Sequence, residues 1–387
     1  MNSRLPGAEM YAAKPGLEDV TIGRTEISFV GGETGRLVYR GYDIADVVEH
    51  LGYEGVVHLL LWGRPAKAEP PADLPHALAA RRSLPPEVAA AVDRFPESLD
   101  GMDALRAGVA VLSGRRFDAP ASDEQGLDLI ALAPTLLARS ARRHRGQPPI
   151  DPDPSLPHVA NFLHMLGGGV PDPTKVWALE SYFDIVADHG MNASTFALRV
   201  VLSTGSDYVS AVTAAIGALK GPLHGGAPQR VLDMLDRVGA PGAAEAWVDA
   251  AVARKERLMG FGHRAYKVED PRAILLRSIA QRVASPERFA LAEAVERAAL
   301  AALRRSHPEQ RLFTNVEFYA ALVLEAAGLP RELFPPTFAL ARTAGWAAHA
   351  LEQSAANRLI RPDITYAGPT DLHFPETASR RHAPPEG

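Results

Sequence analysis

The chain has 387 residues, 47% of them hydrophobic and 22% charged, the ordinary balance of a globular protein with one large or two ordinary domains. With 41 Lys and Arg against 46 Asp and Glu, the net charge is −5 and no basic block occurs, so we expect no nucleic-acid or anionic-membrane surface. The absence of cysteine excludes disulfides, a thiol nucleophile, thiolate zinc sites and iron–sulfur clusters.

The N-terminal part of the chain predicts a short β-hairpin. Residues 20–40 alternate apolar and polar positions, and the alternation breaks at Gly31-Gly32. The first residues contain no apolar stretch long enough for a signal peptide, and no run in the chain approaches 18 apolar residues. We therefore expect a cytoplasmic protein without a membrane span.

From about Ile44 onward, the sequence predicts helix after helix. Apolar residues recur at i, i+3 and i+4, for example over Asp43–Leu61 and Ser181–Ser203. Proline-rich joints separate the helices, at residues 68–75, 83–87 and 146–158. From Gly368, the chain has four prolines and few apolar residues, which is typical of a loose tail. These patterns predict an all-α protein with a small N-terminal hairpin.

The sequence lacks the motifs of several common catalytic and nucleotide-binding sites. No G-x-G-x-x-G follows a strand, no G-x-x-x-x-G-K-[ST] occurs, and no G-x-S-x-G occurs. A Rossmann dinucleotide site, a Walker phosphate loop and a hydrolase nucleophile elbow are therefore disfavoured. Three histidines with glycine neighbours are the stronger candidates.

The first of these histidines, in chain order, is His189 in the segment DHGMNAS. Its surroundings predict a position inside an apolar helical stretch, where a hydrogen-bonded core histidine is the usual case. Taken alone, His189 does not indicate a functional site.

His224 lies in the glycine-rich segment Gly221–Pro228, between predicted helices at Val209–Leu219 and Gln229–Leu235. Pro228 fits the first position of the second helix. The positive end of that helix disfavours an imidazolium, so we expect a neutral His224 that can donate one hydrogen bond. The alternative is a turn whose glycines only serve backbone geometry.

A third segment, MGFGHRAYKVEDPR, begins at Met259 and leads into a predicted helix with Asp270 as N-cap and Pro271 as first residue. Gly260 and Gly262 allow a ligand to approach the backbone closely. Three basic residues gather near the start of this helix, where anions bind: His263, Lys267 and Arg272. This combination favours an anion site.

Three further charged residues stand in less decisive surroundings. Glu317 lies in the first turn of a helix that Asn315 is predicted to cap, a place where an acid is expected on dipole grounds alone. Arg342 lies on a strongly apolar helix and must either extend to solvent or meet a buried anion. Arg361, in a polar turn, has the surroundings of a surface arginine.

The three histidines could also be read as a zinc site. None of them is paired at the spacing of helical metal ligands, no HExxH motif occurs, and the neighbouring arginines would repel a cation. We therefore predict no metal site.

Five motifs, in order along the chain, resemble the citrate synthase family in its shorter bacterial and archaeal form. They are ADHGMNASTFALRVV, GPLHGGAPQRVLDML, MGFGHRAYKVEDPRA, NVEFYAALVLEAAGLP and RTAGWAAHALEQ. The resemblance is supported by LVYRGYDI at 37–44 and RPDITYAG at 361–368, and covers roughly Gly16 to Gly368.

The resemblance implies a nearly all-α fold and an intertwined homodimer. A large helical domain would comprise residues 1–224 and 329–387, with the tail from about 368, and a small helical domain would comprise residues 225–328. The active site would lie between the domains, and closure over oxaloacetate would create the acetyl-CoA site.

The resemblance also implies roles for individual residues. His224 would donate a hydrogen bond to the acetyl carbonyl oxygen as it becomes enolic, and His263 would polarise the oxaloacetate ketone. His189 would bind oxaloacetate. Arg272 and Arg342 would hold its two carboxylates.

The same motifs imply which residue the partner subunit supplies to the site and which residues bind coenzyme A. Arg361 resembles the arginine that reaches across from the partner subunit. Lys267 would bind a CoA phosphate, and backbone atoms of four further residues would face the pantetheine and adenine portions: Met259, Gly260, Phe261 and Gly262.

One position departs from the family pattern. The base that removes the methyl proton is usually Asp, in an NVDF motif, whereas this chain has NVEF with Glu317. The carboxylate is kept but stands one methylene further from the backbone, and a displacement of about 1 Å can cost about 100-fold in rate. Because the rest of the site is intact, we interpret Glu317 as the working base of a variant branch.

The expected function is therefore that of a citrate synthase of the tricarboxylic acid cycle. This acyltransferase would condense acetyl-CoA with oxaloacetate and hydrolyse citryl-CoA to citrate and CoA, without a metal or cofactor. Two alternatives stay open: a 2-methylcitrate synthase that uses propionyl-CoA, and a catalytically weak homologue that binds CoA or a dicarboxylate. An idle relative has no reason to retain Glu317 together with all three histidines.

Overall fold

The computed structural model describes residues 15–17, 20–63, 73–112, 120–225, 227–263, 265–364, 366, 368–369 and 372–373. The chain forms two units, one of residues 25–360 and one of residues 1–24 and 361–387. Most of the tail predicted from Gly368 lies outside the described residues.

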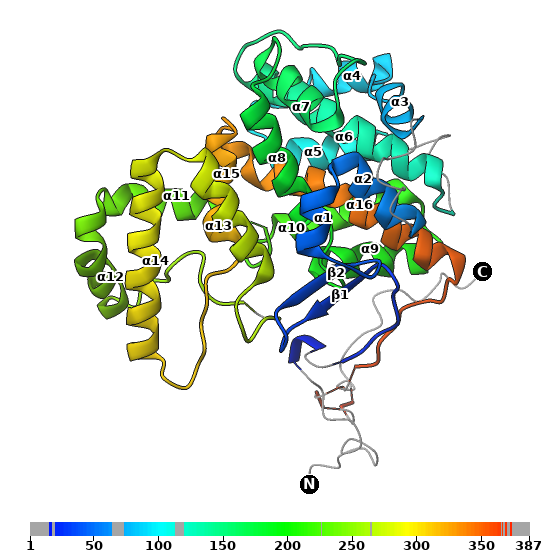
Figure 1. Cartoon of the computed structure of the whole chain (residues 1–387). Helices are drawn as coiled ribbons and strands as arrows, with labels where there is room; N and C mark the ends of the chain where they lie inside the picture. Colours follow the sequence, from blue (N-terminus) through cyan, green and yellow to red (C-terminus); the bar gives the residue numbers. More distant parts are fainter. Residues whose placement is uncertain are drawn as a thin grey trace. The chain divides into compact units, whose positions relative to one another are not determined.

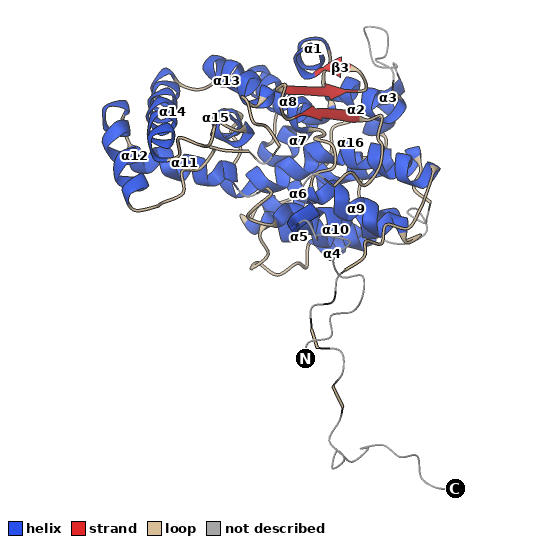
Figure 2. Cartoon of the chain, turned by 90° about the horizontal axis from the view of Figure 1, so that it is seen from below, coloured by secondary structure: helices blue, strands red, loops and turns tan. Residues whose placement is uncertain are grey.

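The predicted hairpin is present, with a third short strand that the sequence did not indicate. β1 (Ser28–Gly31), β2 (Arg36–Tyr39) and β3 (Tyr42–Asp43) form an antiparallel sheet in that order. Among the described residues, strands are confined to this small sheet, and helices make up most of the rest (Figure 2). The predicted all-α fold with an N-terminal hairpin is thus confirmed.

Ten α-helices precede the GPLHGG segment in the described residues: α1 (Ile44–His50), α2 (Tyr53–Trp62), α3 (Asp73–Ala79), α4 (Pro86–Val92), α5 (Gly101–Val111), α6 (Asp123–His144), α7 (His158–Gly167), α8 (Pro173–Val186), α9 (Ala193–Ser203) and α10 (Tyr208–Lys220). Six follow it there: α11 (Ala227–Val238), α12 (Ala244–Ala253), α13 (Pro271–Val283), α14 (Pro286–Ser306), α15 (Val316–Ala326) and α16 (Phe334–Ala355). Short 3-10 helices lie at η1 (Pro15–Leu17), η2 (Pro241–Ala243) and η3 (Arg331–Leu333).

Helix α16 lies at the centre of the large helical group. It packs against α2, α6, α8 and α9 (Figure 1). Every residue from Ala339 to Ala350 is buried. A helix that is apolar on all sides is stable only inside a core, which explains its position. Any polar side chain on α16 is therefore held within the protein, and Arg342 and His349 are two such residues.

The helices α11 to α15 form a second group beside the first (Figure 1). In this group α11 packs on α15, α12 on α14 and α13 on α15, while α13 and α15 also pack on α8. The domain division predicted at residues 225–328 stays a prediction.

The structure corrects two predicted helical stretches. Residues 181–203 form no continuous helix, because α8 ends at Val186 and α9 begins at Ala193. Gly190 between them has φ +55°, outside the helical range, and the Asn192 side chain accepts hydrogen bonds from the first backbone amides of α9. His189 therefore lies in a turn and not inside a helix. Residues 43–61 likewise divide into α1 and α2.

The predicted helix starts near the other two histidines are close to the observed ones. Asp270 caps α13 with Pro271 as its first residue, and Asn315 caps α15, as the sequence predicts. Helix α11 begins at Ala227, so that Pro228 is its second residue and not its first. None of the helices in the described part of the chain combines the length and apolar composition that a bilayer span requires.

Candidate active site

Five of the predicted site residues come together from segments far apart in the sequence. His189 lies in the α8–α9 turn, His224 in the loop before α11, and His263 in the loop before α13, while Arg272 and Arg342 lie on α13 and α16. Burial holds the pKa of the His189 imidazole well below 6.5, the charges of Arg272 and Arg342 lower it further, and protonation of His263 or His224 would act in the same direction. The five side chains thus share one electrostatic environment.

The hydrogen bonds of His263 determine which of its ring nitrogens carries the hydrogen. The backbone amides of Ala265 and Tyr266 donate to Nδ1, at 2.9 and 3.0 Å, so Nδ1 is the acceptor. Burial, followed by the nearby Arg272 charge, lowers the pKa of His263 to about 4, so the ring is neutral and Nε2 carries the hydrogen. Nε2 lies 3.1 Å from Nη2 of Arg272, which is also a donor. The Nε2–H group therefore needs an acceptor other than Arg272.

His224 is held in the opposite tautomer. The backbone amide of Ser194 donates to its Nε2 at 3.2 Å, and the Ser194 hydroxyl lies 3.0 Å from the same nitrogen. Burial, with the Arg342 charge as the second cause, lowers the pKa of His224 to about 4. A neutral ring with an accepting Nε2 carries its hydrogen on Nδ1. The neutral donor expected from the sequence is consistent with this geometry.

His189 has a partner that the sequence did not indicate. Its Nε2 lies 3.2 Å from the hydroxyl of Tyr266, and its ring centroid lies 5.5 Å from that of His263. Tyr266 itself packs 4.9 Å from the His263 ring, between centroids. This tyrosine thereby connects the α8–α9 turn with the loop before α13.

The two arginines are buried cations with different partners. Arg272 is 3% exposed and forms an ion pair with Asp270, with Nε–Oδ1 and Nη2–Oδ2 distances of 3.0 and 2.8 Å. Arg342 is 1% exposed, and its Nε donates to the carbonyl oxygen of Val186 at 2.8 Å. Its Nη1 is buried and has no hydrogen-bond partner among the described residues.

A buried guanidinium with an unused donor fits an anionic ligand. Leaving a charged donor unpaired in a protein interior is costly, and a carboxylate offers two acceptors in the geometry that arginine prefers. The sequence left two outcomes open for Arg342, extension to solvent or contact with a buried anion. Because Arg342 does not extend to solvent, the structure favours an anion-binding role.

Glu317 stands at the start of α15, which is tied to the His263 loop. The Asn315 side chain accepts from the Glu317 amide at 3.0 Å and donates to the Gly262 carbonyl oxygen at 2.9 Å, and the Asn315 amide donates to the Gly260 carbonyl oxygen at 2.9 Å. Burial raises the pKa of Glu317 from 4.5 to about 7, although the charges of Arg272, Arg257 and Arg230 oppose the rise. A carboxylate with a pKa near 7 is suited to act as a general base at neutral pH.

The residues predicted to bind coenzyme A lie along the loop that precedes α13. Gly260 and Gly262 have φ of +85° and +82°, and a Cβ at Gly260 would lie 2.8 Å from Phe318 Cβ. Gly260 is therefore required by packing as well as by backbone conformation. Phe261 is buried against the Phe318 ring, and Lys267 is exposed and forms an ion pair with Glu33. The role of these residues and of Met259 in coenzyme binding stays a prediction.

Arg361 belongs to a different unit of the chain from the other predicted site residues. It is exposed and belongs to the unit of residues 1–24 and 361–387, whereas the others lie in the unit of residues 25–360. Its predicted contribution to a partner's site stays a prediction. No group of His, Asp or Glu residues that could hold a metal ion occurs in the described ranges.

Three residues of the site have roles that sequence reasoning did not assign: Ser194, Tyr266 and Asp270. Asp270 was predicted only as an N-cap, and it also pairs with Arg272. Ser194 and Tyr266 lie inside the family motifs, and this position was the only sign of a role in the site. Nothing in their local sequence predicts that Ser194 contacts His224 or that Tyr266 contacts His189.

Comparison with known proteins places these residues in a family context. A family model described as citrate synthase, C-terminal domain, matches residues 16–363. Citrate synthase of Acidithiobacillus ferridurans is 37% identical over 95% of this chain and 98% of that protein. A 2-methylcitrate synthase of Mycobacterium tuberculosis is also 37% identical, over 94% of this chain and 93% of that protein. The solved structure of Thermoplasma acidophilum citrate synthase, in a ternary complex with carboxymethyl coenzyme A and oxaloacetate, has a TM-score of 0.87 at 29% identity and covers 95% of this chain and 100% of that chain.

Proposed function

The chain belongs to the citrate synthase family of acyltransferases, and we propose that it condenses acetyl-CoA with oxaloacetate and hydrolyses the resulting citryl-CoA to citrate and CoA. The observation that carries this proposal is the fixed tautomer of two neutral histidines. Backbone amides occupy one nitrogen of His224 and one of His263, and each ring keeps an N–H donor for a substrate oxygen.

The arginines and His189 support a dicarboxylate as the first substrate. Arg272 and Arg342 supply two buried positive charges, one for each carboxylate of oxaloacetate. The Nε2–H of His263, beside Arg272, would donate to the ketone oxygen, while His189 would contribute a further hydrogen bond. The relative from Thermoplasma acidophilum is described with oxaloacetate bound, which supports the same ligand here.

Glu317 and His224 support removal of a proton from the acetyl methyl group. This proton is weakly acidic, so its removal needs a base at the methyl and a hydrogen-bond donor at the carbonyl oxygen. Glu317 would accept the proton, and the Nδ1–H of His224 would stabilise the enolic oxygen. The carbon–hydrogen electron pair then forms the new bond to the ketone carbon, and the ketone oxygen takes a proton as it becomes the hydroxyl of citryl-CoA.

Hydrolysis completes the proposed reaction. Water adds its hydroxyl to the acyl carbon, the carbon–sulfur bond breaks, and the sulfur leaves as the thiol of CoA. The products balance as citrate and CoA, and the step consumes one water molecule.

A second candidate is 2-methylcitrate synthesis from propionyl-CoA. The relative that carries this name is as similar to the chain as the citrate synthase of Acidithiobacillus ferridurans, at 37% identity each. The two reactions differ by one methylene of the acyl group, which a hydrophobic pocket discriminates by about 10–200-fold.

A thiol-release assay tests the proposal directly. Because the chain has no cysteine, a chromogenic thiol reagent detects only the CoA that the reaction liberates. We expect oxaloacetate-dependent thiol release with acetyl-CoA, and a kcat/KM at least about tenfold above that with propionyl-CoA. Each acyl-CoA without oxaloacetate controls for simple thioester hydrolysis.

The other outcomes of this assay point to the alternatives. A higher kcat/KM with propionyl-CoA would assign 2-methylcitrate synthesis. No oxaloacetate-dependent release with either acyl-CoA would indicate the catalytically weak homologue.

A further inference from the structure

One face of α16 contacts the turn between α8 and α9. Four of its residues are spaced i, i+3, i+4 and i+7, which places them on the same side of a helix: Arg342, Gly345, Trp346 and His349. A Cβ at Gly345 would lie 2.4 Å from the Ala187 carbonyl oxygen, so only glycine allows this close approach. The indole Nε1 of Trp346 donates to the Ser194 hydroxyl at 3.3 Å. The helix thus contacts the turn near both of its ends.

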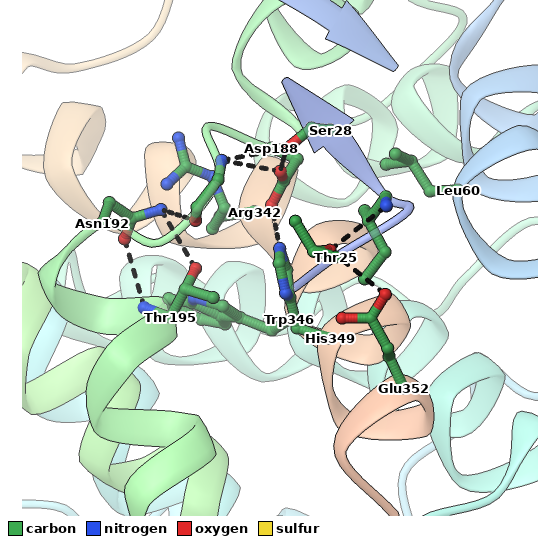
Figure 3. A network of polar contacts seen from close by, with 12 residues as sticks. Thr25, Ser28, Leu60, Asp188, Asn192, Thr195, Arg342, Trp346, His349 and Glu352 are labelled. Carbon is green, nitrogen blue, oxygen red and sulfur yellow. Dashed lines mark hydrogen bonds and ion pairs between the residues drawn. The ribbon is translucent and has the colours of Figure 1, made fainter. Parts of the chain in front are cut away.

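The carboxylate of Asp188 is the polar centre of this turn (Figure 3). Asp188 is fully buried, and its Oδ2 accepts hydrogen bonds from the Gly190 amide, at 2.9 Å, and from the Ser28 hydroxyl of β1. Its Oδ1 faces Nε2 of His349 at 3.2 Å. The carboxylate therefore joins the turn to β1 on one side and to α16 on the other.

His349 is oriented toward Asp188 by a third residue. Its Nδ1 lies 3.1 Å from Nη1 of Arg199, and a guanidinium nitrogen can only donate, so Nδ1 accepts. With Nδ1 as the acceptor, the ring hydrogen of His349 is on Nε2, which faces Asp188. Arg199 is itself fixed by an ion pair of 2.8 Å with Glu352 and by donation to Gln353 at 3.0 Å.

The contact between His349 and Asp188 is close but not well aligned. Nε2 and Oδ1 are both buried, and neither atom forms a well-formed hydrogen bond within the described residues. Functional hydrogen bonds are often long or poorly aligned without substrate and become shorter in the substrate complex. The 3.2 Å separation nevertheless places Nε2 of His349 within ion-pair distance of the Asp188 carboxylate.

The turn contains one histidine of the proposed site and holds a second one that lies in another loop. His189 follows Asp188 directly, and Ser194, at the start of α9, holds the ring of His224 through its amide and hydroxyl. A change in the position of Asp188 would therefore alter the ligand contact proposed for His189 and the direction in which His224 presents its N–H donor.

We propose that His349 is a positioning residue of the active site, which restrains Asp188 through its Nε2–H and so fixes the turn of residues 188–194. This inference rests on the proposed function, because its effect is measured on the condensation reaction. His349 does not contact substrate in this proposal. It acts through Asp188 on His189 and His224.

Two substitutions at His349 separate its two hydrogen bonds. In His349→Gln, the side-chain amide nitrogen can replace Nε2 and still donate to Asp188. In His349→Asn, the shorter side chain places its oxygen near the position of Nδ1, so it can accept from Arg199 but has no donor that reaches Asp188. Both replacements are neutral, polar and smaller than histidine, which makes each a control for the other.

The expected results differ between the two variants. We expect His349→Asn to raise the KM for oxaloacetate about tenfold and to lower kcat about tenfold, since small displacements of site groups cost factors of this size. We expect His349→Gln to stay within about threefold of wild type in both constants. The control is His158→Asn, a buried histidine whose described contacts are with Glu54 and Tyr53 of α2 and not with residues 188–194. It should lower the melting temperature and leave both constants unchanged.

The proposal is wrong if the two His349 variants have the same kcat and KM, whether both match wild type or both are impaired. If His349→Asn does not fold, Ser28→Ala removes another side-chain restraint on the Asp188 carboxylate, at a partly exposed position. It should raise the KM for oxaloacetate about threefold, and an unchanged KM would refute the proposal. Failure of the proposed function is distinguishable, because the wild-type protein would then release no thiol with oxaloacetate and either acyl-CoA.

Discussion

Replacing Glu317 by Gln separates proton removal from substrate binding. The amide keeps the shape of the carboxyl group but cannot accept the methyl proton of acetyl-CoA. General bases contribute about 10²–10⁴-fold to rate, so we expect kcat to fall by that factor in Glu317→Gln. The KM for oxaloacetate should change by less than about threefold, since Arg272, Arg342 and His189 are unaltered.

The same substitution has a calculable effect on stability. Burial raises the pKa of Glu317 from 4.5 to about 7, so between these pH values the folded protein holds a proton that the unfolded chain has released. The contribution of Glu317 to stability therefore falls as pH rises from about 4.5 to about 7. Above pH 7, the half-buried carboxylate costs about 3 kcal/mol. Because glutamine stays neutral, Glu317→Gln should be more stable than wild type at pH 8, with a smaller difference at pH 5.

Two measurements check these expectations. Exchange of the acetyl-CoA methyl protons with deuterium, followed by NMR in the presence of a non-condensing oxaloacetate analogue, isolates the proton-transfer step. Urea unfolding of both proteins at pH 5 and pH 8 gives the stability difference. Glu245→Gln is the matched control, because Glu245 lies in the first turn of α12 but is exposed. It should leave exchange unchanged and shift stability equally at both pH values.

Either of two results would contradict the role of Glu317 as a desolvated general base. Wild-type exchange rates in Glu317→Gln would show that another residue is the base. An equal stability difference at pH 5 and pH 8 would show that the Glu317 carboxylate is not desolvated in the folded protein.

Three further substitutions test other parts of the site and the assembly. If the site has adapted to the longer acid, Glu317→Asp should lower kcat by about 100-fold, measured by thiol release; a rise in kcat would mean that the site suits aspartate better. Gly345→Ala should lower the free energy of unfolding by about 3 kcal/mol in urea titrations, because its Cβ would lie 2.4 Å from the Ala187 carbonyl oxygen; wild-type stability would contradict the close packing. We propose a homodimer in which each active site contains residues of both subunits. Mixing inactive Arg361→Ala and His224→Ala subunits under conditions that exchange them should therefore restore activity. No recovery of activity would count against a shared active site.

Local sequence patterns predicted much of the fold and identified the candidate residues of the site. Helix caps are an example, because the side chains of Asp270 and Asn315 accept bonds from amides two residues away. The hairpin break at Gly31-Gly32 is local in the same sense. Motifs also named His224, His263 and the two arginines before their positions in the fold were known.

Residues 181–203 show where local patterns were insufficient. Apolar spacing continues through the segment, and it predicts one helix with His189 inside it. The structure instead forms a turn, in which Asp188 contacts β1 and α16. These contacts come from residues far away in the chain, so the spacing of apolar residues within the segment contains no information about them.

The fold class, the caps of α13 and α15 and the candidate side chains of the site could thus be predicted from residues a few positions apart. The tautomers of His224 and His263, the raised pKa of Glu317 and the contact between His349 and Asp188 could not be predicted in this way. Each of these properties is set by burial and by charges or donors from separate segments. Desolvation and electrostatic interaction depend on distance in space, and the folded chain alone defines those distances.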